Sequence, residues 1–185
     1  MTLKPNYQLM NADEMRGTLN RLAEEILAAH TGRDLVLVGI QRRGIPMAQR
    51  MAKTMSNTAR IRPQLGMLDI NLYRDDLTTV DIKPVVSGTD IPFSVQGKDI
   101  ILMDDVLYTG RTIRAALDAL FDHGRPARVQ LLVLIDRGHR ELPIEARFIG
   151  RTVQTTESEI IEVKFQEIDN MEKVLLCEKA EAGAA

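Results

Sequence analysis

The chain has 185 residues, of which 44% are hydrophobic and 27% are charged, proportions typical of one compact domain with a single core. Lys and Arg total 24 against 26 Asp and Glu, a formal net charge of −2, which excludes a general electrostatic attraction to nucleic acid or to an anionic membrane. Any such binding requires a local basic patch.

Cysteine content and hydropathy exclude further classes. Cys177 is the single cysteine, so neither an intramolecular disulfide nor a cysteine zinc cluster can form. No segment approaches the roughly 20 apolar residues of a membrane-spanning helix, and "MTLKPNYQLMNADEM" lacks the apolar core of a signal peptide. We expect a soluble cytoplasmic protein with no membrane association, folded as a single domain over residues 1–185.

The first third of the chain has the pattern of a helix, a strand and a second helix. Asn11 and Glu14 have the spacing of a capping box, and apolar residues at helical spacing predict a helix over residues 12–30, ended by Gly32. "LVLVGI", residues 35–40, is a short apolar run typical of a strand buried on both faces. After the basic "QRRG", Pro46 suits the first turn of a helix whose apolar face is Met47, Met51 and Met55.

The middle of the chain is less regular. "LDINLY", residues 68–73, alternates apolar and polar side chains and predicts a strand with one exposed face. The following stretch, "RDDLTTVDIKPVVSGTDIPFSVQGKD", contains two prolines and two glycines. Such a long loop in a compact domain is usually functional or mobile, so we expect a flexible active-site loop over about residues 74–97. A short hairpin through Val85-Val86 and 91–93 is the alternative.

The second half repeats the strand and helix pattern. "IILM" predicts a central strand, residues 112–123 a helix closed by Gly124, and "RVQLLVLI" another strand. "ARFIG", "EIIEVKF" and "KVLLC" are β-like segments that should extend or cap the sheet edge. The predicted fold is α/β, with a central, mainly parallel sheet flanked by helices and a small hood of C-terminal β segments.

Three polar clusters follow strands of this predicted sheet. Arg42 and Arg43 follow the first strand, Asp104 and Asp105 the central strand, and Asp136 and Arg137 the next. In open parallel sheets, ligands bind at the carboxyl ends of the strands. The three loops should therefore converge on one crevice.

The segment "YTGRT" has the features of a phosphate cradle. Gly110 frees backbone N–H groups at a helix start, and Thr109 and Thr112 add hydroxyls. Carboxylates so close to a phosphate need an intervening group, and the cis diol of a ribose donates two hydrogen bonds to Asp104 and Asp105. The spacing suggests a ribose 5′-phosphate, although paired aspartates at a strand end or a Thr-Gly helix cap are each common without a ligand.

The whole string "IILMDDVLYTGRT", residues 100–112, resembles the binding loop of the type I phosphoribosyltransferases for phosphoribosyl pyrophosphate (PRPP). The resemblance implies that Asp104 and Asp105 hold the ribose hydroxyls, that residues 106–112 wrap the 5′-phosphate, and that "GIQRRG", residues 39–44, grips pyrophosphate. The implied PRPP and nucleotide site is Gln41, Arg42, Arg43, Asp104, Asp105, Val106, Leu107, Tyr108, Thr109, Gly110, Arg111 and Thr112.

A narrower resemblance rests on "LDINLYRDDL", "DDVLYTGRT" and "IDRGHRELPIEARFIG". Together they are similar to the PyrR family, regulators of pyrimidine operons with uracil phosphoribosyltransferase activity. The implied reaction is uracil plus PRPP giving UMP and pyrophosphate. Asp105 and Asp136 are both candidates for taking the uracil N1 proton, and the sequence does not choose between them.

The resemblance also implies a cofactor and a lid. Mg²⁺ should bind with PRPP, near Asp104 and Asp105 and partly through water, without an organic cofactor. The loop after Tyr73 suits a lid that keeps water from the reaction, with Arg74 at its base reaching the pyrophosphate. The alternative for Arg74 is a solvated charge at a strand end.

The base should lie against residues 135–137, where Ile135, Asp136 and Arg137 are the candidate base-binding residues and Arg137 can stack or hydrogen-bond. His139 is expected to be a structural loop residue. Because backbone groups and pocket shape read the base, the preference for uracil rests on the resemblance alone.

The second activity implied is UMP-dependent binding of pyrimidine-operon leader mRNA, with UMP or UTP as effectors. RNA binding requires Lys and Arg facing phosphates, and acidic residues interrupt the basic clusters of this chain. The candidates are Arg16, Arg21, Arg140, Arg147 and Arg151.

Other function classes stay open or are excluded. A phosphoribosyltransferase without RNA binding and a non-catalytic nucleotide-sensing regulator are the alternatives. The chain has neither a Walker nor a dinucleotide glycine motif, which excludes those nucleotide sites. Relatives by this resemblance form homodimers or larger homo-oligomers.

Overall fold

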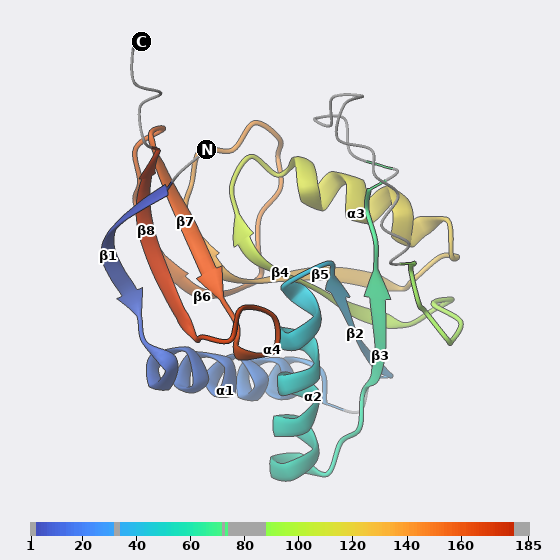
Figure 1. Ribbon diagram of the computed structural model, residues 1–185. Coiled ribbons are helices and arrows are strands. Elements are labelled where there is room, and N and C mark those ends of the chain that lie inside the picture. Colours follow the sequence, from blue (N-terminus) through green and yellow to red (C-terminus); the bar gives the residue numbers. More distant parts are fainter. Residues whose placement is uncertain (1–2, 32–33, 72, 74–87, 180–185) are drawn as a thin grey trace.

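The computed structural model (Figure 1) contains a five-stranded parallel sheet with helices on both faces. It describes residues 3–31, 34–71, 73 and 88–179. The strand order is β3-β2-β4-β5-β6, and every neighbouring pair is parallel. The strands are β2 (Leu35–Ile40), β3 (Gln64–Leu68), β4 (Asp99–Leu107), β5 (Arg128–Asp136) and β6 (Phe148–Thr152).

Alternate side chains of the central strands pack on opposite faces of the sheet, as the pleat requires. Leu37 and Ile101 face the cluster formed with helices α1 (Ala12–Ala29) and α2 (Gly44–Ala59). Val38 and Leu102 face the cluster formed with α3 (Arg111–Phe121). Figure 1 shows α3 across the sheet from α1 and α2. The sheet is buried on both faces, which explains the continuous apolar runs of β2 and β4.

The predicted helices are present, with small differences at their ends. The capping box of α1 is formed, since the Glu14 N–H donates to Asn11 Oδ1 (2.9 Å) and the Asn11 N–H to Glu14 Oε2 (2.8 Å). The helix ends at Ala29 with His30 as its cap, before Gly32. Similarly, α3 covers Arg111–Phe121 in place of residues 112–123.

The strand predicted at "LDINLY" is wrong in its position. The parallel strand is β3, Gln64–Leu68, and the chain leaves the sheet after Leu68. Asp69 Oδ1 accepts a hydrogen bond from the Asn71 N–H (3.0 Å), an Asx turn that ends the strand. The apolar alternation arises because Leu68 and Ile70 both pack in the cluster beneath α3.

The predicted flexible loop, about residues 74–97, is only partly covered. Residues 74–87, including Val85-Val86 and Arg74, lie outside the described residues. Within the described part, Asp90 forms an isolated antiparallel bridge with Met67. The 91–93 arm of the alternative hairpin does not form a strand.

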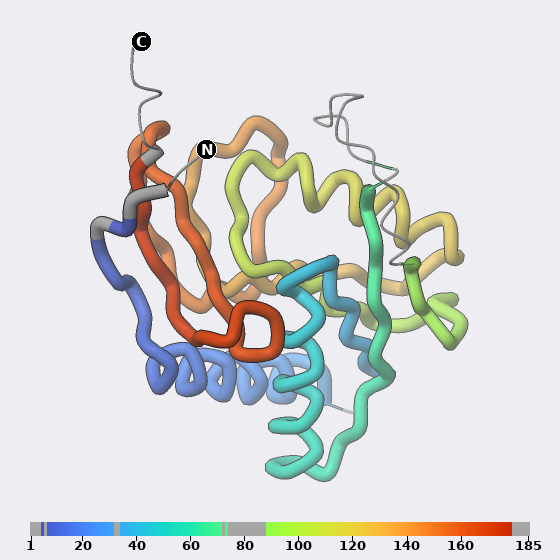
Figure 2. Tube along the Cα trace, in the orientation of Figure 1, coloured from blue at the N-terminus to red at the C-terminus, as the bar shows by residue number. Residues whose placement is uncertain are grey.

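A second, smaller sheet forms the hood, which we define as β1 (Leu3–Met10), β7 (Glu159–Lys164), α4 (Gln166–Asp169) and β8 (Lys173–Lys179). Its order is β1-β8-β7, all antiparallel. Figure 2 shows β1 and β8, from opposite ends of the chain, side by side. The predicted C-terminal hood is present, and β6 extends the edge of the main sheet, the other placement predicted for these segments. The third hood strand, β1, was not predicted, because irregular pairing around Pro5 and Gln8 disrupts its alternation.

None of the helices within the described ranges is long and apolar enough to cross a membrane.

Two glycines let α2 start directly against the sheet. A Cβ on Gly44 would lie 2.2 Å from the Met103 carbonyl oxygen, and one on Gly39 would lie 2.5 Å from the Gly44 oxygen. These are backbone atoms, which cannot rotate away as a side chain could. The loop 41–43 therefore sits directly beside β4 only because both positions lack a side chain.

We predict that Gly44→Ala lowers the free energy of unfolding by roughly 3 kcal/mol, because overpacking against backbone forces α2 away from β4. Urea unfolding measures it. The control is Gly17→Ala in α1, where a Cβ would meet nothing within 4 Å, and which should stabilise by about 0.5–1 kcal/mol. Equal stability of the Gly44→Ala protein and the parent would contradict the packing argument.

Candidate active site

A cavity of about 670 Å³ opens at the carboxyl ends of the parallel strands. Its walls come from the β2–α2 loop, the turn after β3, the end of β4 and the start of α3. The residues that line it are Gln41, Arg42, Arg43, Asp69, Ile70, Asn71, Asp104, Asp105, Val106 and Thr112. Two of the three loops predicted to converge, those after β2 and β4, meet here.

The loop between β2 and α2 places two guanidinium groups at the cavity. The Gln41 N–H donates to the Leu68 carbonyl (2.9 Å), which fixes the loop to the end of β3. The peptide bond between Gln41 and Arg42 is cis. Arg42 is exposed, whereas Arg43 is only 29% exposed and pairs with Asp169 of the hood (Nη2 to Oδ1, 2.9 Å). Burial opposes the charge of Arg43, but Asp169 and Asp105 outweigh it and raise its pKa.

Asp104 and Asp105 lie near the carboxyl end of β4, which extends to Leu107. Asp104 is buried, and its Oδ1 accepts the Asp105 N–H (3.0 Å). Burial raises the pKa of Asp105, although Asp104 and Arg43 act in the opposite direction. A carboxylate whose charge is poorly stabilised by the protein suits a site where a ligand supplies donors or a cation.

The turn after β4 has the geometry of an anion site. Gly110 has a φ of 93°, a left-handed conformation that favours glycine, and α3 starts at Arg111. Thr109 Oγ1 accepts the Arg111 N–H (3.3 Å), and Thr112 lines the cavity. A phosphate would bind at this N-terminus of α3, where the first N–H groups of a helix lack partners within the helix. Of the neighbouring residues, Leu107 is buried and Tyr108 is 36% exposed.

The third predicted loop packs behind this turn and does not line the cavity. Asp136, at the end of β5, accepts from the Gly138 N–H (3.0 Å) and from Arg140 Nη2 (2.5 Å), so both its oxygens are engaged. Arg140 also donates to the carbonyls of Tyr108 (2.8 Å) and Ile144 (3.0 Å). Arg140, a predicted RNA contact, thus links residues 136–144 to the turn between β4 and α3, which we call the phosphate turn.

The other base-loop candidates are likewise engaged. Ile135 is fully buried, so only its backbone could meet a base. Arg137 is 5% exposed; it donates to Thr155 Oγ1 (3.1 Å) and the Thr156 carbonyl (3.1 Å), and lies 4.1 Å from the Tyr108 ring centroid. Burial lowers its pKa despite the opposing effects of Tyr108 and Glu159. His139 bonds to the Thr155 carbonyl (2.6 Å), as a structural histidine would.

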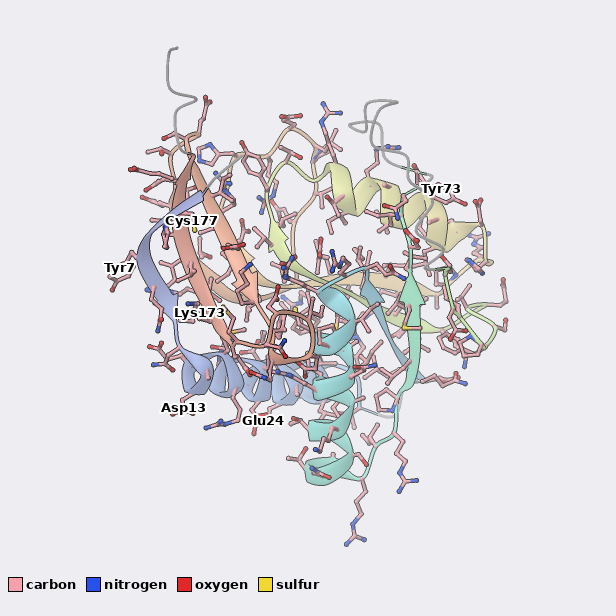
Figure 3. All side chains as sticks on the ribbon, viewed as in Figure 1. Tyr7, Asp13, Glu24, Tyr73, Lys173 and Cys177 are labelled. Carbon is pink, nitrogen blue, oxygen red and sulfur yellow. The ribbon has the colours of Figure 1, made fainter. Side chains whose placement is uncertain are left out.

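The start of the long loop is attached to α3. Tyr73 Oη donates to Asp122 Oδ2 (2.5 Å), and Arg114 donates to the Tyr73 carbonyl (3.1 Å). Figure 3 shows Tyr73 beside α3, and the hydrogen bond to Asp122 raises its pKa. The predicted contact of Arg74 with pyrophosphate lies outside the described residues.

The remaining RNA candidates lie at two places, the start of α1 and the edge strand β6. Arg16 pairs with Asp13 (2.6 Å) at the start of α1. Arg21 crosses from α1 to the edge strand β6, where it donates to the Gly150 carbonyl (2.8 Å), and Arg151 donates to the Leu9 carbonyl (2.6 Å). Arg147 is exposed just before β6. Arg21 and Arg151 share the lining of a hollow of about 460 Å³.

Sequence reasoning missed three features of this region. Asp69 and Asn71 line the cavity, yet they were read as part of a strand. Asp169 was not singled out, although it pairs with Arg43 across 126 positions of the chain. Only the polar residues of "LDIN" offered a local signal; Asp169 lies in a segment whose pattern indicated only a β edge.

Comparison with known proteins identifies the family. Residues 8–168 match the phosphoribosyl transferase domain. The chain is 53% identical over 175 residues to "Bifunctional protein PyrR" of Pelotomaculum thermopropionicum, covering 94% of this chain and 97% of that protein. It is 54% identical over 173 residues to the protein of the same name from Thermus aquaticus, with 93% and 96% covered. The chain belongs to the PyrR family.

Solved structures show the same fold outside the PyrR family. A hypoxanthine-guanine phosphoribosyltransferase from Bacillus anthracis superposes with a TM-score of 0.71 at 15% identity, covering 96% of this chain and all of the other. The hypoxanthine phosphoribosyltransferase of Trypanosoma cruzi has a TM-score of 0.71 at 13% identity, with 95% and 98% covered. The predicted type I phosphoribosyltransferase fold is confirmed, and this PyrR-family chain is a phosphoribosyltransferase.

We predict that Asp105→Asn stabilises the free protein. The pKa of Asp105 is raised in the folded protein. The carboxyl therefore does not destabilise the fold below its ordinary pKa, where it is protonated in both states. It lowers the free energy of unfolding as the pH rises through the folded-state pKa. At pH 7 to 8 the variant should gain about 1 kcal/mol, and the gain should vanish toward pH 4.

Urea unfolding across this pH range measures the effect. Asp90→Asn is the control, since it makes the same charge change at an exposed side chain and should stay within about 0.5 kcal/mol of the parent at every pH. A gain that persisted unchanged at pH 4 would contradict the assignment to the Asp105 charge.

Proposed function

We propose that the protein transfers the phosphoribosyl group of PRPP to uracil, giving UMP and pyrophosphate. The observation that supports this most is the cavity itself, in which Arg42 and Arg43, the Asp104-Asp105 pair and Thr112 of the phosphate turn line one space. A pyrophosphate, a ribose diol and a 5′-phosphate need these three kinds of group in this order.

Each part of PRPP has a matching part of the cavity. The 5′-phosphate binds the N–H groups and hydroxyls at the start of α3, and the ribose hydroxyls donate to Asp104 and Asp105. The leaving pyrophosphate meets Arg42 and Arg43, whose fixed charges stabilise the anion as it develops. The carboxylates, in turn, lie where positive charge develops on the ribose.

The proton acceptor for uracil N1 is better supported at Asp105 than at Asp136. Both Asp136 oxygens already accept hydrogen bonds, one of them from the cation of Arg140, and Asp136 does not line the cavity. Burial raises the pKa of Asp105, as general base catalysis near neutral pH requires. The uracil then lies over Val106, and residues 135–137 act by holding the turn in place.

Mg²⁺ fits this arrangement as a companion of PRPP. Within the described ranges, no group of three or more His, Cys, Asp or Glu side chains could hold a metal, whereas Asp104 and Asp105 offer the hard oxygen ligands that Mg²⁺ prefers. The ion would share these carboxylates, in part through water, with oxygens of the substrate. When bound, it neutralises pyrophosphate charge.

We predict that the Asp104→Asn, Asp105→Asn double variant loses at least roughly 100-fold in kcat/KM for uracil and PRPP, since both diol acceptors and the proposed base are removed. Pyrophosphate release on mixing uracil, PRPP and Mg²⁺ measures it, with Asp90→Asn as the control for charge. Turnover at the parent rate would sink the catalytic assignment. No release by the parent protein would favour a non-catalytic nucleotide-sensing regulator.

A second activity, UMP-dependent binding of pyrimidine-operon leader mRNA, is supported by the relatives named bifunctional. The surface that suits it is the β6 edge, defined here as Arg21, Arg147 and Arg151. The lower face of α1 suits it less, because Asp13 and Glu24 point outward there in Figure 3. Arg140 is engaged within its loop, and Arg16 is paired with Asp13. Arg21 is likewise paired with Glu25 (2.5 Å), which leaves Arg147 and Arg151 as the residues of the β6 edge to test.

We predict salt-sensitive RNA binding that UMP strengthens, measured by filter binding of leader RNA across a salt series. Arg147→Gln or Arg151→Gln should reduce the salt slope by about one each, because each removes a phosphate contact. Arg62→Gln, exposed beyond α2, is the control and should leave the slope unchanged. Absence of salt-sensitive binding would leave a phosphoribosyltransferase without RNA binding.

A further inference from the structure

Arg43 lies between the cavity and the hood. It lines the cavity and feels the charge of Asp105 on that side. On the other side, its Nη2 donates to Asp169 Oδ1 (2.9 Å) and its Nε faces Asp169 Oδ2 (3.4 Å). Asp169 thus contacts one edge of the guanidinium through two nitrogens, an arrangement that sets the plane of the group as well as its position.

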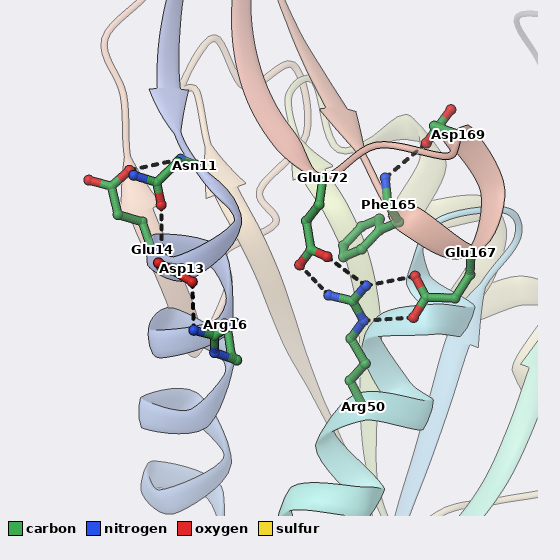
Figure 4. Close-up of polar contacts among 9 residues, drawn as sticks. All are labelled: Asn11, Asp13, Glu14, Arg16, Arg50, Phe165, Glu167, Asp169 and Glu172. Carbon is green, nitrogen blue, oxygen red and sulfur yellow. Dashed lines mark hydrogen bonds and ion pairs between the residues drawn. The ribbon is translucent and has the colours of Figure 1, made fainter.

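Asp169 is itself held firmly. It closes the single turn of α4, where its N–H donates to the Phe165 carbonyl (2.7 Å) and its Oδ2 accepts the Phe165 N–H (2.9 Å), as Figure 4 shows for the carboxylate. Phe165 is fully buried. The Asp169 side chain is 13% exposed, and Lys164 Nζ lies 3.9 Å away. The pKa of Asp169 is lowered, since Arg43, the Phe165 N–H and Lys164 outweigh its burial.

A second contact fixes α4 to α2, the helix whose N-cap is Arg43. Arg50 of α2 donates to Glu167 Oε1 and Oε2 (both 2.7 Å) and to Glu172, and its guanidinium lies 5.2 Å from the Phe165 ring centroid. Figure 4 shows Arg50 between the two glutamates. Arg43 and Arg50 are seven residues apart, about two helical turns, so both face the hood. The Arg50 clamp, defined as Arg50, Glu167 and Glu172, therefore keeps Asp169 in register with Arg43.

We propose that Asp169 is a positioning residue that orients the guanidinium of Arg43 toward the pyrophosphate of PRPP. This rests on the proposed transferase function. Asp169 acts through Arg43 and touches neither the ribose nor the base. The hood thereby contributes to leaving-group binding although its strands lie outside the cavity, and the effect should be confined to ligands that carry a pyrophosphate.

Two other roles for Asp169 predict different results. If Asp169 only neutralised Arg43 and competed with the ligand, its removal would tighten pyrophosphate binding. If it only stabilised the fold, its removal would weaken UMP and PRPP binding together and lower the melting temperature. UMP carries the 5′-phosphate and ribose without pyrophosphate, so it separates positioning of Arg43 from general damage to the site.

The test compares Asp169→Asn with the parent in three measurements: KM for PRPP, the inhibition constant of Mg²⁺-pyrophosphate, and the Kd for UMP. We expect the first two to rise roughly tenfold, with kcat falling less, because a misplaced charge costs affinity for the group it faces. UMP affinity should stay within about twofold. Glu178→Gln is the control, since it makes the same charge change at an exposed side chain of β8, outside the Arg50 clamp.

A double-variant cycle tests the route through Arg43. Arg43→Met alone should cause a loss like that of Asp169→Asn, and the double variant should lose no more than Arg43→Met, because coupled residues are not additive. Should Asp169→Asn fail to bind UMP, Asp169→Glu replaces it in the same measurements, since it keeps the charge but displaces it by one methylene.

Several results would overturn the inference. They are tighter pyrophosphate binding, equal losses for UMP and PRPP, additive losses in the cycle, or full recovery of the Asp169→Asn protein at raised Mg²⁺, which would place Asp169 on the metal. Failure of the transferase proposal is distinguishable: in that case the parent protein itself would release no pyrophosphate from uracil and PRPP.

Discussion

The close contact between Gly44 and the Met103 carbonyl is the constraint on which the active site depends. It brings the start of α2 against β4, one residue before Asp104, and so places the arginine loop beside the aspartate pair. A longer distance would separate cations from carboxylates and leave two half-sites. A backbone contact of this kind holds the loop more rigidly than side chains could, because neither partner can change rotamer.

The charges of the cavity form a sequence of complementary groups. Arg43 lies between Asp169 and Asp105, so its cation is shared by the hood and the sheet. The pKa of Asp105 is raised because its burial outweighs the stabilisation that Asp104 and Arg43 give to the carboxylate. A ligand with hydroxyl donors and a metal ion would therefore stabilise the charge of Asp105 further. The Asp105 carboxylate that suits the ligand also lowers the stability of the fold.

Much of this architecture could be predicted from local signals. The capping box of α1, the apolar runs of β2 and β4, and the string from Ile100 to Thr112 each act over a few residues, and the structure places them as expected. The errors share another cause. The strand at "LDINLY" was misplaced because Leu68 and Ile70 pack on one cluster while the Asx turn at Asp69 has already ended the ladder. Burial alternation alone does not distinguish a strand from a turn that returns to the same core.

The features that sequence could not supply are contacts between distant segments. β1 gains its structure from β8, at the other end of the chain, and Arg140 acquires its role only because β5 places its loop behind Tyr108. The pairing of Asp169 with Arg43 is of the same kind. A charged residue in a short turn is usually solvated, so its sequence context favours no function. In the folded protein the Arg50 clamp holds that turn against α2, and an otherwise ordinary carboxylate becomes part of the surroundings of the leaving group.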